Sequence, residues 1–73
     1  MLTTRQSEVF SMIGGFIQSH GYPPTRAEIA KHFGFNVNAA EDHLRALERK
    51  GVLQVHTGIS RGIKVLDQNA RLS

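Results

Sequence analysis

Residues Thr25 to Gly51 have the sequence TRAEIAKHFGFNVNAAEDHLRALERKG, and the fold prediction starts from them. This stretch opens with a capping box, because Thr25 stands three residues before Glu28 and directly follows two prolines. This spacing predicts a short helix that ends at Gly34. A three-residue connection beginning at Gly34 then leads into a second helical pattern, which Gly51 ends. Two helices joined by so short a turn must cross each other.

The second helix of this pair is predicted over residues 37–50, with Asn36 as its N-cap and Asn38 as a competing cap. A spacing of about 100° per residue divides this helix into two faces. One face carries Ala40, Leu44 and Leu47 and is expected to be buried. The opposite face is polar and consists of Asn38, Glu41, Asp42, Arg45 and Arg49. One face therefore belongs to the core and the other is available for contacts.

Upstream, Thr3 and Gln6 form another capping box, which predicts a helix that stops at Gly21. Apolar residues in this helix follow the i, i+3, i+4, i+7, i+8 pattern of an amphipathic stripe. The stripe consists of Val9, Met12, Ile13, Phe16 and Ile17. The short helix over 26–33 is expected to bury Ile29, Ala30 and Phe33. Two adjacent glycines, Gly14 and Gly15, either allow close packing or weaken the first helix locally.

After Gly51 the pattern changes to β-branched, partly alternating residues. Residues 52–56 and 62–66 are predicted to form a two-stranded hairpin with a Gly-containing tip between them. The fold class expected is thus mainly α with a small β-hairpin. We expect residues 1–66 to form one domain and residues 67–73 to be a flexible tail or the start of a linker.

Length and composition limit the function classes. A chain of 73 residues without Cys has no disulfide framework, thiolate metal site or Cys nucleophile. No segment approaches the ~20 apolar residues that span a bilayer, and no signal peptide is recognisable, so a cytoplasmic location with no membrane contact is expected. The four His residues lack metal-ligand spacing and no nucleophile has a base. We therefore expect no enzyme activity, cofactor or metal.

Charge is unevenly placed along the chain. The formal net charge is +3, with 9 Lys and Arg against 6 Asp and Glu. Residues 1–44 carry a net charge of −1 and residues 45–73 carry +4. A basic C-terminal half favours a polyanionic partner, most simply nucleic acid.

Three helices followed by a hairpin make a winged helix-turn-helix. The major groove admits one α-helix, and the third helix has one face for the core and one for the groove. Arg61, in the hairpin tip, is placed to reach the neighbouring DNA backbone or minor groove.

At this level of detail the chain resembles the N-terminal DNA-binding domains of the LexA family, repressors of bacterial DNA-damage (SOS) response genes. The resemblance runs from Leu2 to about Leu66. The stretches that carry it are Leu2-Thr3-x-Arg5-Gln6-x-Glu8-Val9-Phe10, Gly21-x-Pro23-Pro24-Thr25-Arg26-Ala27-Glu28-Ile29-Ala30, Gly34-Phe35, Asn38-Ala39-Ala40-Glu41-Asp42-His43-Leu44-Arg45-Ala46-Leu47-x-Arg49-Lys50-Gly51 and Gly58-x-Ser60-Arg61-Gly62-Ile63. It implies a sequence-specific repressor module that occupies a double-stranded DNA operator.

The resemblance also implies residue roles. Base contacts are expected from Asn36, Asn38, Ala39, Glu41 and Asp42. Contacts with the DNA backbone are expected from Arg5, Thr25, Arg26, Arg45, Lys50, Ser60 and Arg61. The chemistry agrees, because Asn can pair with adenine, an acid can accept from cytosine N4 and Ala can touch a thymine methyl group. Helix-dipole stabilisation of the acids and a Glu41–Arg45 pair are the alternative uses of these side chains.

This sequence departs from the family in two places. The family usually has three residues between the Gly-Phe pair and the Asn-Ala-Ala run, often with Ser-Pro, whereas this chain has only Asn36 and Val37. A turn one residue shorter can rotate or shift the recognition helix, which bears on base specificity. The family's C-terminal domain, which cuts its own linker and supplies most of the dimerisation, has no counterpart in these 73 residues.

Two kinds of partner are expected. Without the C-terminal domain that links two copies in the family, we expect a monomer in solution, or a weak dimer that forms on DNA. The alternative is a protein-interaction or antagonist module that pairs with a full-length repressor or a replication protein.

Overall fold

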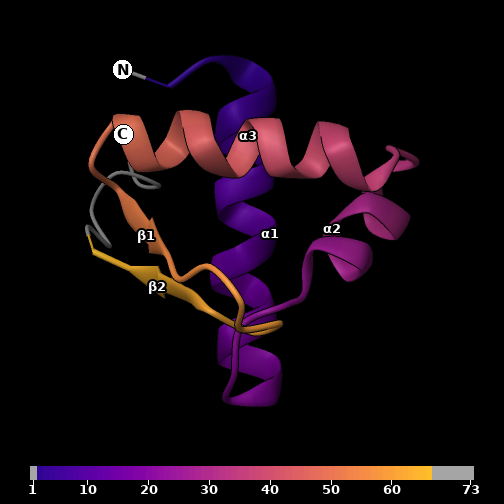
Figure 1. The fold of residues 1–73 in the computed structure, drawn as a ribbon, viewed down its shortest axis with the longest axis vertical. Coiled ribbons are helices and arrows are strands. Elements are labelled where there is room, and N and C mark those ends of the chain that lie inside the picture. Colours follow the sequence, from indigo (N-terminus) through magenta and orange to yellow (C-terminus); the bar gives the residue numbers. More distant parts are fainter. Residues whose placement is uncertain (1, 67–73) are drawn as a thin grey trace.

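The computed structural model describes residues 2–66, which form three helices followed by an antiparallel hairpin (Figure 1). The helices are α1 (Thr4–His20), α2 (Arg26–Phe33) and α3 (Val37–Arg49), and the strands are β1 (Leu53–Val55) and β2 (Ile63–Val65). In Figure 1, α3 crosses in front of α1, with α2 on one side and the hairpin on the other. The predicted fold class, a winged helix-turn-helix, is confirmed. The predicted tail, residues 67–73, lies outside the described residues.

Side-chain caps begin all three helices. Thr3 and Gln6 form the first capping box, and Thr25 and Glu28 form the second, each through two reciprocal hydrogen bonds. Asn36, and not its competitor Asn38, caps α3, since its Oδ1 accepts from a backbone N–H at 2.8 Å. The predicted starts are therefore correct, because these bonds join residues within one helical turn.

The core lies where α1, α2, α3 and the hairpin meet. Its buried apolar residues are Val9, Phe10, Ile13, Ile29, Ala30, Ala40, Leu44, Leu47, Val52, Leu53 and Ile63. The face predicted for α3 is buried as expected. In α1, however, Phe10 is buried although it lies outside the predicted stripe, while Met12, Phe16 and Ile17 are only half-buried. Because α1 packs against both α2 and α3, its covered face is rotated from the one that periodicity alone indicated.

Three smaller predictions from the sequence are wrong. Phe33, predicted in the core, is half-buried: it packs against the buried cluster and stacks on the half-buried Phe35. Helix α3 ends at Arg49, one residue early, with Lys50 as its C-cap. The strands are shorter than predicted, with three residues each, although hydrogen bonds from His56 to Gly62 and from Leu66 to Val52 continue the pairing beyond them.

Hairpin register follows from which side chains are buried. Leu53 pairs with Val65 and Val55 with Ile63, so the apolar partners share the face that meets the core. The backbone N–H of Val55 also donates to Glu48 at the end of α3, at 3.1 Å. This bond fastens the hairpin to the C-terminal end of α3.

Candidate nucleic-acid interface

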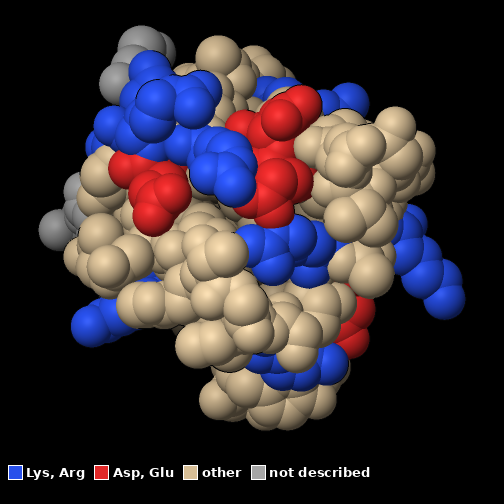
Figure 2. Space-filling model, viewed as in Figure 1, with Lys and Arg blue, Asp and Glu red and all other residues tan. Residues whose placement is uncertain are grey.

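Helix α3 presents a polar face to solvent. Asn38, Asp42, Arg45 and Arg49 are exposed, while the opposite side of the helix is fully buried. Figure 2 shows acidic and basic side chains lying next to one another over the region that α3 occupies in Figure 1. A helix held by one face and polar on the other has the shape and chemistry that a major-groove contact requires.

The N-terminal turn of α3 holds the predicted base-contacting residues. Asn38 is exposed and Ala39 half-buried, and both lie in the first turn of the helix. Asn36 is exposed, but its side-chain oxygen is used to cap the helix, so a base contact by this residue would come from its amide nitrogen. Val37 is 49% exposed at the same end, which makes it an apolar candidate that the sequence reasoning missed.

Glu41 is enclosed by two arginines. Its Oε1 accepts a hydrogen bond from Nε of Arg26, and its Oε2 lies 3.1 Å from Nε of Arg45. The side chains of Glu41 and Arg26 are only 23% and 26% exposed, whereas that of Arg45 is 60% exposed. The structure thus brings together one predicted base-contacting residue and two predicted backbone-contacting residues, and it compensates the acid's charge within the protein.

Arg61 points into the protein. Its Nη1 donates to the carbonyl oxygen of Pro23 at 2.9 Å and to Glu28 at 2.7 Å, and its Nη2 donates to the other oxygen of Glu28 at 3.1 Å. Its guanidinium also lies over the ring of Tyr22, 4.6 Å from the centroid. The carboxylate of Glu28 is therefore shared between the α2 capping box and the hairpin tip.

These contacts shift two pKa values. The hydrogen bond from Arg61, followed by the backbone N–H of Thr25, lowers the pKa of Glu28 from 4.5 to about 2. The same pairing with Glu28 raises the pKa of Arg61. Both groups are thus charged in the whole pH range in which proteins bind DNA.

The remaining residues predicted to contact the DNA backbone lie at several places around α3. Arg5 lies near the turn between α2 and α3, with its guanidinium carbon 5.3 Å from the ring centroid of Phe35, and it pairs with Glu8 at 3.3 Å. Thr25 caps α2, Lys50 is the C-cap of α3, and Ser60 is exposed at the hairpin tip. The fold therefore spreads these residues over helix termini and a loop, which are common sources of phosphate contacts.

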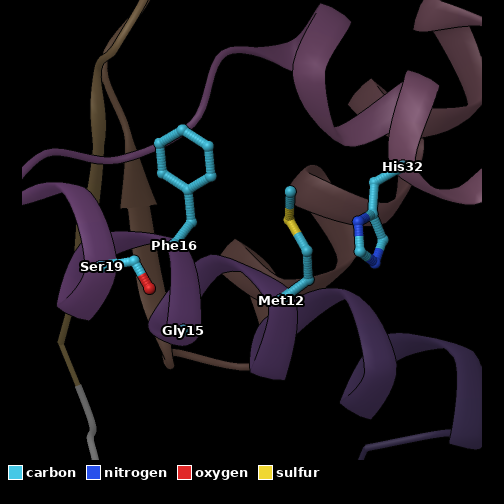
Figure 3. A pocket seen from close by; sticks show the side chains of 5 residues that line it. All are labelled: Met12, Gly15, Phe16, Ser19 and His32. Carbon is cyan, nitrogen blue, oxygen red and sulfur yellow. The ribbon is translucent and has the colours of Figure 1, made fainter.

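A shallow hollow lies away from this surface, between α1 and α2. Met12, Gly15, Phe16, Ser19 and His32 line it (Figure 3). In Figure 3 the side chain of Met12 rises from α1 beside the imidazole of His32 on α2, and the ring of Phe16 rises from α1 on the far side of Met12. The lining is mostly apolar, which does not suit a polyanion.

Within residues 2–66, no helix combines the length and apolar composition needed to cross a bilayer. No three His, Asp or Glu side chains in that range come together where they could hold a metal ion.

A buried three-helix core, an exposed polar third helix and a flanking hairpin define a winged helix-turn-helix domain of the DNA-binding class. Residues 1–62 match the family model described as the LexA DNA binding domain. The chain belongs to this family of DNA-binding domains.

Two curated relatives extend the comparison. The chain is 59% identical over 66 residues to the LexA repressor of Histophilus somni strain 2336 and, to the same extent, to that of strain 129Pt. The alignments cover 89% of this chain and 31% of each relative. The chain thus spans about a third of the length of these repressors.

Proposed function

We propose that this chain binds double-stranded DNA in a sequence-specific manner, with α3 in the major groove, and represses transcription by occupying an operator. The observation that supports this best is the division of α3 into a fully buried apolar face and an exposed polar face. Family membership over residues 1–62 and the likeness to LexA repressors support the same function. Such a module acts on the chromosome, hence in the bacterial cytoplasm and in association with the nucleoid.

Base contacts are assigned to the first two turns of α3. Asn38 pairs with adenine through its amide, and Asp42 accepts a hydrogen bond from cytosine N4. Ala39 and the exposed Val37 offer methyl groups to thymine. Glu41 and Asn36 remain in this set, although both carboxylate oxygens of Glu41 are paired with arginines and the side-chain oxygen of Asn36 caps α3.

Backbone contacts are assigned to the basic and hydroxyl residues that surround this surface. Such contacts position the domain without selecting sequence. They also offset the repulsion between phosphates and the acids on α3. The residues proposed are Arg5, Thr25, Arg26, Arg45, Lys50 and Ser60.

One domain of this size makes few phosphate contacts, so a single copy binds weakly and with strong salt dependence. We propose that the chain is monomeric in solution and that two copies occupy half-sites about one helical turn apart. The test is selection of bound duplexes from a random oligonucleotide pool, followed by binding to the selected and a scrambled duplex at several salt concentrations. A palindromic consensus with selective binding is expected. Equal or absent binding to both duplexes at low salt contradicts the proposal and favours the protein-interaction module.

A further inference from the structure

The hairpin, here called the wing and comprising residues 53–65, needs support from the rest of the fold. Two strands of three residues are too short to be stable by themselves. The bond from Val55 to Glu48 and the buried Leu53 secure the end of the wing next to α3. The tip, with Gly58, Ile59 and Ser60 exposed, lies at the other end.

Arg61 supplies the support at the tip. We define the Arg61 clamp as the contacts of this guanidinium with the Glu28 carboxylate, the Pro23 carbonyl and the Tyr22 ring. These partners lie 33 to 39 positions away in sequence, in the α1–α2 connection and the first turn of α2. Figure 1 shows the wing tip beside the α1–α2 connection, where these contacts form.

The geometry limits what else this arginine can do. Both terminal nitrogens are bonded to Glu28, one to each carboxylate oxygen, in the bidentate arrangement that fixes a guanidinium most firmly. The side chain is 38% exposed, and Glu28 compensates its charge at 2.7 Å. Glu28 and Pro23 take three of the five N–H donors of the guanidinium and compensate its charge, so it attracts phosphate less than a solvated arginine would.

We propose that Arg61 is a positioning residue, which holds the wing tip against α2 so that Ser60 meets the DNA backbone, and that its own guanidinium does not contact phosphate. This inference rests on the proposed DNA-binding function. It replaces the backbone contact that the family resemblance implied for Arg61. The low pKa of Glu28 supports it, because the pair stays ionised under all ordinary binding conditions.

The test compares Arg61→Lys with Arg61→Ala in binding to the duplex selected from the random pool. Lys keeps the positive charge but cannot form the bidentate pair. The clamp predicts that both variants weaken binding by a similar factor, about fivefold. It also predicts that the slope of log K against log salt stays as in the unaltered chain. A near-normal Arg61→Lys variant, with a slope lower by about one for Arg61→Ala, overturns the proposal.

Glu28→Gln provides the matched partner variant, since Gln can keep the capping box while removing the charge. Losing an acid next to DNA would by itself strengthen binding, whereas loosening the clamp weakens it. We expect Glu28→Gln to weaken binding and the double variant with Arg61→Ala to bind no worse than Arg61→Ala alone. Stronger binding by Glu28→Gln, or additive losses, contradict the clamp. Lys31→Ala, which removes an exposed charge from α2, should leave binding nearly unchanged.

The clamp can also be measured without DNA. Nuclear Overhauser contacts between the Arg61 side chain and the Tyr22 ring are expected in the unaltered domain and lost in Glu28→Gln. Their absence from the unaltered domain overturns the clamp even if operator binding is selective. If the contacts are present but the unaltered chain does not prefer its selected duplex, the proposed function fails and the positioning role fails with it.

Discussion

Glu41 accepts a hydrogen bond from Nε of Arg26, so the second turn of α3 is joined to the first residue of α2. The two residues are 15 positions apart and come from the two helices of the helix-turn-helix. Arg45, one turn further along α3, lies on the other carboxylate oxygen. This ion-pair network bears on the crossing of α2 and α3, and therefore on how α3 enters a groove.

Glu41→Gln should lower the free energy of unfolding by about 1 kcal/mol, because it removes a partly buried acid from between two arginines. Urea unfolding followed by circular dichroism measures the change. Glu8→Gln is the control, since Glu8 and its partner Arg5 have side chains that are each 51% exposed, and its effect should stay below about 0.5 kcal/mol. Equal effects of the two substitutions would show that the Glu41 network adds nothing to stability.

Asn38→Ala and Asp42→Ala should each cost about 1–3 kcal/mol of binding free energy and change the preferred bases, because both exposed side chains are assigned to base edges. Repeating the selection from a random pool with each variant shows which positions relax. If Asp42→Ala binds every sequence more tightly, this acid is only a repulsive charge and its assigned base contact is wrong.

Lys50→Ala should weaken binding to all duplexes alike and lower the salt slope by about one, as expected for a phosphate contact at the end of α3. Binding isotherms over a range of potassium chloride concentrations give the slope. A change in base preference with an unaltered slope would assign Lys50 a different role.

Acid should destabilise the domain in a particular pH window. Because the pKa of Glu28 is lowered from 4.5 to about 2 in the fold, its contribution to stability is complete above pH 4.5 and is lost as the pH falls toward 2. Melting temperatures measured from pH 6 to about pH 2 should fall more steeply for the unaltered chain than for Glu28→Gln. Arg61→Ala removes the largest cause of the shift and should flatten the same window. Parallel curves for all three proteins would contradict this.

Replacing glycine by alanine should have opposite effects on stability at two positions. A Cβ at Gly15 meets nothing within 4 Å, so Gly15→Ala should stabilise α1 by about 0.5–1 kcal/mol. A Cβ at Gly62 would lie 2.7 Å from the backbone oxygen of His56, so Gly62→Ala must displace the wing and should destabilise the domain by about 1–3 kcal/mol. Thermal unfolding of the two variants measures both signs. Stabilisation by Gly62→Ala would show that the wing backbone shifts at little cost to accommodate the added Cβ.

The candidate interface was only partly predictable from the chain. The exposure of Asn38 and Asp42 follows from helical periodicity, which needs no knowledge of the rest of the fold. The inward direction of Arg61 cannot be predicted in this way. In the sequence, an arginine in a hairpin tip with Gly58 and Ser60 is expected to be free to contact phosphate. The exposure of Val37 was likewise not predicted from the sequence, since it depends on how α2 and α3 cross.

Local sequence was enough to place the helix starts, the glycines that end α1 and α2, and the polar face of α3. Thr3, Thr25 and Asn36 cap residues only three positions away, so the chain brings these partners together whenever a helix starts. The buried face of α1, the pairing of Glu41 with Arg26 and the pairing of Arg61 with Glu28 depend instead on how the elements pack. The partners in these two pairs are 15 and 33 residues apart, and only the packing of the helices and the wing makes them neighbours.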